Sequence, residues 1–449
     1  MIRFGSPTPV RAFGSLLWLP LVVAGVVSCH KSDSTSATVA AMTSGTLIVT
    51  VTPPLGTTVT VSIAGPSDFN GAVNATDTLL DLGAGIYTVT AASATSNDEV
   101  VSTVYTGVVT GSPANVEIGD TSQTTVTYAP RPGTGGLWVG SSNGGSPIAA
   151  QFTSGELRAG QSPAVSLSVA DAYAVFDANG DLWIASTSAN TITEYVSSQL
   201  ARSGTPAAAV TISGAGLAGP DGLAFDGAGD LWVSNAVGNT VVEYSAQQLA
   251  ATGAPTPAIS ISGGALHAPG ALSFDVYGNL WVPNAGANTV VQFSAAQLLV
   301  GGSLTPAIAF TAVAGSLDSP QALAFDTEGN LWVANLSNAT IIQYSPGQLL
   351  VGGAPTPTAF LSVPGGAVSL AALAFDNSGD LWAVSASTSQ LLEFTADQVV
   401  AAGSQTPGVT IAVAATPNSL AFNPAPDGLP IVSPSAVRLS RRAGQLRRR

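Results

Sequence analysis

The sequence predicts an all-β protein whose larger part is a β-propeller, a ring of similar four-stranded sheets. A Leu-Trp pair recurs six times, at spacings of 45, 49, 49, 51 and 50 residues. Short strand patterns and Gly-containing turns surround every copy, and a fixed period of this size is typical of radial β architectures. We expect the six tryptophans to form the cores of the blades: Trp138, Trp183, Trp232, Trp281, Trp332 and Trp382.

One repeat, residues 222–262, divides into four strands: GLAFD, LWVSN, TVVEYS and AISIS. The second strand is apolar on both faces, as expected where a sheet packs between two neighbours. The first two strands are joined by Asp226–Asp230, an Asp-x-x-Gly-[Asp/Asn] turn that recurs in four other repeats. An Asp that accepts bonds from its own backbone, followed by Gly, suits a tight hairpin. Because the turn lacks the distal bidentate Glu of a calcium loop, we expect a structural role.

The two ends of the array predict how the ring closes. Residues 137–170 supply strands two to four of a repeat, and residues 417–432 supply a first strand. Joining these fragments gives one composite blade and removes exposed sheet edges. Five complete repeats and the composite make six blades. A seventh remains open if Leu429–Leu439 forms strands, although Pro430 and Pro434 disfavour central strands there.

The pattern P-x-G-L-A-F-D-x-x-G-[DN]-L-W-V resembles the NHL-repeat and SMP-30/gluconolactonase-like β-propellers. The resemblance covers residues 137–433, about two thirds of the chain. It implies the propeller fold but does not by itself assign an activity, because one fold supports many functions.

The region before the propeller divides into four segments. Residues 1–29 have the basic start and apolar core of an export signal, and Val26-Val27-Ser28-Cys29 resembles a bacterial lipobox, which predicts lipidation of Cys29. Residues 30–45 are rich in Ser, Thr and Ala and predict a flexible tether. Alternating β-branched runs predict a β-sandwich over residues 46–128, in which GIYTVTA resembles strands of Ig-like or transthyretin-like surface modules. Residues 129–136 are expected to be a linker.

Charge gives the expected partners. The formal net charge is −14, and half of the 12 basic residues lie in the tail, residues 434–449. The globular part is therefore acidic, which disfavours a nucleic-acid partner. The export signal and Cys29 predict an exported lipoprotein of the bacterial envelope, at the outer membrane or cell surface. We expect this lipoprotein to be a monomer. The lipid anchor would attach it to the membrane, and its ligand would be an envelope glycan, peptide or protein.

The sequence lacks the motifs of common catalytic sites. It has no HExxH, GxSxG or phosphate-binding loop, and its histidines are His30 and His267. We therefore expect no enzymatic activity and no cofactor. The repeats differ most where the first strands begin, around the expected channel mouth. The candidate ligand residues are polar positions there and in the connections that reach the same face: Asp221, Gln321, Asn418, His267 and Asp318.

The family resemblance provides the alternative function, a metal-dependent hydrolase or lactonase. SMP-30-like enzymes hold a divalent metal at the channel mouth with Glu, Asn and Asp ligands. Asp221 and Asn418 match two of these positions, and the metal would be Ca²⁺ or Zn²⁺. No Glu stands at a first-strand start to complete the set.

Overall fold

The computed structural model describes residues 44–55, 57–98, 100–142, 148–169, 173–214, 216–313, 315–364, 368–413 and 416–425. The described residues belong to one compact unit that begins at Thr43. Cys29, the predicted tether, the predicted tail and residues 426–433 lie outside the described part of the chain. Among the described residues, no helix has the length and apolar character needed to cross a membrane.

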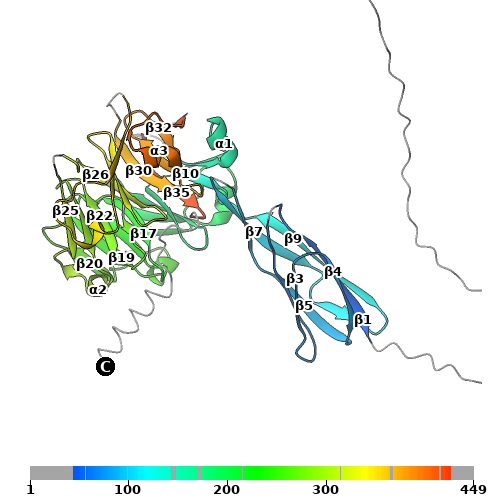
Figure 1. The fold of residues 1–449 in the computed structure, drawn as a ribbon. Helices are drawn as coiled ribbons and strands as arrows, with labels where there is room; N and C mark the ends of the chain where they lie inside the picture. The colour runs from blue at the N-terminus through cyan, green and yellow to red at the C-terminus, as the bar shows by residue number, and fades with distance from the viewer. Residues whose placement is uncertain are drawn as a thin grey trace, which may run out of the picture. The chain divides into compact units, whose positions relative to one another are not determined.

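The N-terminal module consists of two antiparallel-rich sheets (Figure 1, blue to cyan). Its core is formed by alternating residues of each strand, such as Leu47, Val49 and Val51. The first and last strands pair in parallel, which ties the two ends of the module together. One sheet has the order β4 (Asp77–Leu82), β1 (Gly45–Thr52), β9 (Thr121–Pro130), β7 (Ser102–Thr110), β6 (Ala94–Asn97). The other has the order β3 (Asn70–Val73), β2 (Val61–Ala64), β5 (Gly85–Ala91), β8 (Ala114–Val116).

The remaining sheets confirm the predicted all-β propeller, with six blades in the described residues. Blade 1 contains β35 (Thr416–Asn423), β10 (Gly136–Ser142), β11 (Ile148–Thr153) and β12 (Val165–Ser168). Blade 2 contains β13 (Tyr173–Phe176), β14 (Leu182–Ser186), β15 (Thr191–Tyr195) and β16 (Val210–Ser213). Blade 3 contains β17 (Pro220–Phe225), β18 (Leu231–Asn235), β19 (Thr240–Tyr244) and β20 (Ile259–Ser262), with the short β24 (Gly302–Ser303) at its edge.

Blades 4 to 6 repeat the same strand order. Blade 4 contains β21 (Ser273–Phe274), β22 (Leu280–Asn284), β23 (Thr289–Phe293) and β25 (Ile308–Thr311). Blade 5 contains β26 (Pro320–Phe325), β27 (Leu331–Asn335), β28 (Thr340–Tyr344) and β29 (Ala359–Ser362), with β33 (Gly403–Ser404) at its edge. Blade 6 contains β30 (Leu370–Phe375), β31 (Leu381–Ser385), β32 (Gln390–Phe394) and β34 (Val409–Ala412).

Blade 1 closes the ring by pairing the two ends of the array, as the sequence predicts. Strand β35 runs antiparallel to β10, from Gly136 opposite Asn423 to Ser142 opposite Thr416. The predicted linker contributes to this closure. Its Gly133 carbonyl accepts the indole N–H of Trp138 and the side-chain N–H of Asn423, both at 3.0 Å. The predicted linker thus begins within β9 and is bonded to blade 1 at its other end.

Adjacent blades are joined by contacts between aromatic rings. The tryptophan of one blade meets the first-strand phenylalanine of the next at five junctions, with ring centroids 5.8 to 6.4 Å apart. At the sixth junction, Trp382 and Phe422 belong to the same apolar cluster. The tilted edge-to-face geometry at most junctions is the favoured arrangement of aromatic pairs. The six tryptophans of the Leu-Trp pairs are at most 3% exposed.

The Asp turn fixes each tryptophan to its own blade. In blade 5, Asp326 Oδ1 accepts the backbone N–H groups of Glu328 and Asn330, at 3.0 and 2.9 Å. Its Oδ2 accepts the indole N–H of Trp332 at 2.9 Å. The same Asp–indole bond occurs in blades 3, 4 and 6. The turn residue is therefore both a backbone cap and the hydrogen-bond partner of a buried tryptophan.

Short helices occupy the connections after the third strands. In most of these helices a Gln side chain in the first turn accepts a hydrogen bond from the backbone N–H of the residue three positions before it. Gln297 Oε1, for example, accepts the Ser294 N–H at 2.9 Å. The helices are α1 (Ser154–Ala159), η1 (Ser197–Ala201), η2 (Gln248–Ala250), α2 (Ala295–Leu298), η3 (Gln348–Leu350) and α3 (Ala396–Ala401).

We predict that Asp326→Ala lowers the free energy of unfolding by about 2 kcal/mol, because it leaves the buried Trp332 indole N–H without an acceptor. Urea unfolding followed by tryptophan fluorescence measures this change. Thr327→Ala, an exposed position in the same turn, is the control and should change stability by less than about 0.5 kcal/mol. Equal effects of the two variants would contradict the proposed role of Asp326.

Candidate functional site

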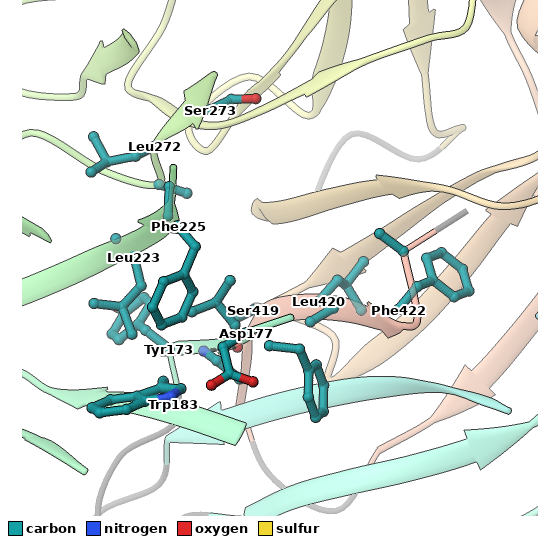
Figure 2. Close-up of a pocket in the computed structure, with 18 of the residues that line it drawn as sticks. Tyr173, Asp177, Trp183, Leu223, Phe225, Leu272, Ser273, Ser419, Leu420 and Phe422 are labelled. Carbon is teal, nitrogen blue, oxygen red and sulfur yellow. Dashed lines mark hydrogen bonds between the residues drawn. The ribbon is translucent and has the colours of Figure 1, made fainter. Parts of the chain in front are cut away.

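A cavity of about 880 Å³ follows the central channel of the propeller. The first strands of all six blades line it, and Figure 2 shows side chains from four of these blades around it. Its wall is mostly apolar because four of the six first strands carry the sequence Leu-Ala-Phe, and the other two carry Leu-Ser-Phe and Ala-Val-Phe. The repeated wall residues are Leu223, Leu272, Leu323, Leu373, Leu420, Phe225, Phe274, Phe325, Phe375 and Phe422.

Asp221 lies at the end of the cavity where the first strands begin. It is 6% exposed and comes from β17 of blade 3. Its Oδ2 accepts the side-chain N–H of Gln321 from blade 5 at 2.9 Å, and the Tyr173 side chain also bonds to it. Blade 4 places Gly270 at the equivalent position, so no side chain separates Asp221 from Gln321. Burial raises the pKa of Asp221, and the bonds from Tyr173 and Gln321 oppose this rise.

Asn418 lies at the same end of the cavity, on β35 of blade 1. Its side chain is 8% exposed. Neither its Oδ1 nor its Nδ2 has a hydrogen-bond partner in the described structure. Burying an amide without partners costs free energy, so such a group in a native fold calls for an explanation.

The other candidate residues lie outside this cavity. His267 is exposed, and its Nε2 lies 2.9 Å from the Gly264 carbonyl oxygen within its own connection. Asp318 lies at the end of the connection that leads into β26 and donates its backbone N–H to Asn335 Oδ1 at 3.0 Å. The structure thus brings Asp221 and Gln321 into contact and places Asn418 on the same cavity, while His267 and Asp318 do not line it.

The opposite end of the cavity, next to the Asp turns, differs most in blade 2. The Trp183 indole N–H there has no hydrogen-bond partner in the described structure, although Trp183 is only 3% exposed. Asp177 bonds instead to its own turn, including the Asp181 N–H at 2.9 Å. Arg131 also lines this end and packs against Gly180, where a Cβ atom would lie 3.0 Å from the guanidinium.

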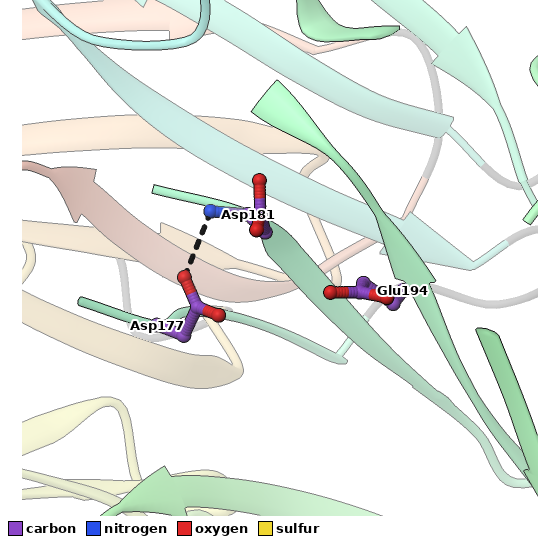
Figure 3. Close-up of side chains that lie close together, drawn as sticks. All are labelled: Asp177, Asp181 and Glu194. Carbon is purple, nitrogen blue, oxygen red and sulfur yellow. Dashed lines mark hydrogen bonds between the residues drawn. The ribbon is translucent and has the colours of Figure 1, made fainter. Parts of the chain in front are cut away.

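Two blades hold a cluster of three carboxylates at the turn. One cluster is Asp177, Asp181 and Glu194 (Figure 3), and the other is Asp376, Asp380 and Glu393, with oxygen atoms within 4.8 Å of one another. Burial, together with the neighbouring carboxylates, raises the pKa of Glu393 to about 7 and that of Asp376 to about 6. Carboxylates this close need a shared proton or a cation. Three oxygen ligands, however, are fewer than the six to eight that Ca²⁺ takes.

The repeats show how the fold adapts to these clusters. Where the third strand carries Glu, the turn ends in Asp, and where it carries Gln, the turn ends in Asn. The pairs are Asp181–Glu194, Asp230–Glu243, Asp380–Glu393, Asn279–Gln292 and Asn330–Gln343. In blades 4 and 5 the Asn amide donates to the first Asp of the turn, at 2.9 and 2.8 Å. The amide N–H groups thus donate hydrogen bonds at the positions where the acidic blades carry carboxylates.

No protein-family model and no curated protein matches the chain. Among solved structures, the chain is similar to a streptogramin B lyase, with 13% identity over 64% of this chain and 87% of that chain and a TM-score of 0.43. It is also similar to virginiamycin B lyase from Staphylococcus aureus, with 14% identity over 59% and 82% and a TM-score of 0.40. A protein of unknown function from Bacteroides caccae gives 11% identity over 64% and 97% and a TM-score of 0.46. Likeness this distant carries no argument about function, which must come from the residues of this chain.

We predict that the blade 6 cluster makes stability depend on pH. The folded pKa values of Asp376 and Glu393 lie above the ordinary values of 3.8 and 4.5, so the folded chain binds more protons than the unfolded chain in this range. The free energy of unfolding should therefore decrease as pH rises from about 4 through about 7. Asp380→Asn combined with Glu393→Gln, which copies blade 5, should weaken this dependence.

The reciprocal variant, Asn330→Asp with Gln343→Glu, should introduce the same loss of stability into blade 5. Urea unfolding at several pH values between 4 and 8 measures both effects. The interpretation would be wrong if both double variants followed the pH profile of the wild type.

Proposed function

We propose that the chain is an envelope lipoprotein whose propeller binds a ligand in its central channel without catalysing a reaction. The observation that carries this proposal is a mostly apolar cavity with buried Asp221 and Asn418 at one end. A concave apolar site with a few convergent polar groups is the usual form of a small-molecule binding site.

The chemistry of the lining supports binding rather than catalysis. The described residues that line the cavity include carboxylates and amides but no histidine, cysteine or lysine. His267 lies outside the cavity, so a Ser-His-Asp arrangement there finds no support in the described residues. Asp221 is held by two neutral donors, Tyr173 and Gln321, which suits a fixed hydrogen-bonding group.

The cellular setting of the proposal comes from the sequence. The lipobox ending at Cys29 supports export and lipid anchoring, which would hold the protein at the outer membrane or cell surface. The ligand would then be an envelope glycan, peptide or protein segment, or a smaller molecule present there. We expect the protein to be a monomer without a resident cofactor in this role. We also propose that it is related to the NHL and SMP-30-like propellers.

The alternative is a metal-dependent hydrolase or lactonase. The observation in its favour is Asn418, whose buried Oδ1 is available as a ligand. Asp221 would be the second ligand, but its Oδ2 already accepts a bond from Gln321. The other described carboxylates that line the cavity, Asp177, Glu194 and Asp226, belong to the Asp turns and their third-strand neighbours at the opposite end. The described residues at the Asp221 end therefore do not complete the metal site that the family resemblance implies.

The binding proposal predicts that residues 30–449, purified without chelator, contain less than about 0.1 equivalent of Ca²⁺ or Zn²⁺, because Asp221 and Asn418 alone make too few ligands. Elemental analysis by mass spectrometry measures this. Asp221→Ala should leave the metal content unchanged. One equivalent of metal in the wild type, lost in Asp221→Ala, would instead favour the hydrolase.

The localisation proposal predicts that Cys29→Ser moves the protein from the membrane fraction to the soluble fraction of the exporting cell, because the acylated side chain is removed. Fractionation followed by immunoblotting measures this, and Ser28→Ala serves as the matched control that keeps the cysteine. Membrane retention of Cys29→Ser would show that something other than the lipid anchor holds the protein there.

A further inference from the structure

The end of the cavity that holds Asp221 also contains a group that the fold itself does not use. Asn418 is 8% exposed, and both atoms of its amide lack partners in the described structure. Its neighbours on the same strand are bonded normally. Ser419 Oγ, for example, accepts the Ala174 N–H at 3.1 Å and so joins blade 1 to blade 2. Asn418 is therefore held in place by a bonded strand while its own side chain remains available.

The chemistry of Asn418 limits what can pair with it. Its Oδ1 accepts and its Nδ2 donates, so a complementary group must donate and accept at two adjacent atoms. An amide does this and stays neutral at all ordinary pH values. A hydroxyl presents both functions on a single atom, and a carboxylate only accepts. A carboxylate would also be repelled by Asp221, which is buried at the same end of the cavity.

The rest of the cavity defines the remainder of the ligand. Beyond the end that holds Asp221 and Asn418, the wall of the cavity is formed by the repeated Leu and Phe side chains of the first strands. The cavity volume of about 880 Å³ lies within the range of small-molecule sites, which leaves room for an apolar chain. Burial of such a chain against these side chains is favourable.

We infer that the channel binds an apolar molecule with an amide head group, with the head paired to the Asn418 side chain and the apolar body against the Leu and Phe wall. This inference rests on the proposed function and assigns a ligand class to it. Asp221, fixed by Gln321 and Tyr173, offers its carboxylate to a second N–H of the same head.

Isothermal titration calorimetry with residues 30–449, which contain the whole compact unit from Thr43 onward, tests this. The probes are decanamide, decan-1-ol and decanoic acid, which share an apolar chain. Decanamide should bind about tenfold more tightly than the other two probes, because only it satisfies both atoms of Asn418.

Asn418→Leu should reduce decanamide affinity to that of decan-1-ol while leaving decan-1-ol binding in place. The same variant should not lower the thermal unfolding temperature, because it replaces an unpartnered buried amide with an apolar group of similar size. Asn179→Leu is the matched control, since Asn179 lines the opposite end of the cavity. It should keep the preference for decanamide.

Three results would overturn the inference. Equal binding of decanamide and decan-1-ol to the wild type would show that no amide is recognised, although binding in the channel would stand. A preference that survives Asn418→Leu, or disappears in Asn179→Leu, would place the head group elsewhere. No binding of any probe would overturn both the inference and the proposed channel-binding function.

Discussion

The propeller depends on the contact between the tryptophan of each blade and the first-strand phenylalanine of the next. These rings meet at 5.8 to 6.4 Å at five junctions, and the tryptophans are almost completely buried. The Asp turn accepts the indole N–H in blades 3 to 6, and the Gly133 carbonyl accepts that of Trp138 in blade 1. The Trp183 indole of blade 2 packs in the same way without a hydrogen-bond partner in the described structure. The pairing of β10 with β35 then closes the ring, so each blade has a neighbour on both sides.

This repeated packing explains where function can arise. The Leu, Phe, Trp and Asp positions are fixed by the fold, whereas the residue before the first-strand repeat is free to vary. Three of these variable positions carry Asp221, Gln321 and Asn418. A single missing side chain, at Gly270, allows Asp221 and Gln321 to bond across the intervening blade. The polar end of the cavity is thus a consequence of small differences between otherwise equivalent blades.

Much of the propeller can be predicted from the sequence because each strand is repeated five or six times. The second strands begin at the Leu-Trp pair in five blades and one residue before it in blade 1. The N-terminal module was harder to predict, since β4 is mostly exposed and β3, β6 and β8 have only three or four residues. These strands are set by pairing with distant neighbours rather than by a local hydrophobic pattern.

The site could be predicted only in part. The variable first-strand position indicates Asp221, Gln321 and Asn418, but their arrangement depends on ring closure. The sequence does not predict that the Asn418 amide and the Trp183 indole N–H lack hydrogen-bond partners in the described structure, because both residues occupy ordinary repeat positions. The matched Asp–Glu and Asn–Gln pairs are visible in the sequence. Their meaning requires knowing that the turn and the third strand lie together, as Asp181 and Glu194 do.

The most direct test of the channel as a binding site is a crystal structure of residues 30–449 grown with decanamide. The account predicts density for the ligand along the Leu and Phe wall, with its amide within hydrogen-bond distance of both side-chain atoms of Asn418 and one N–H directed at Asp221. An empty channel, or a ligand whose head lies beside Arg131 and Asp177 at the turns, would contradict it.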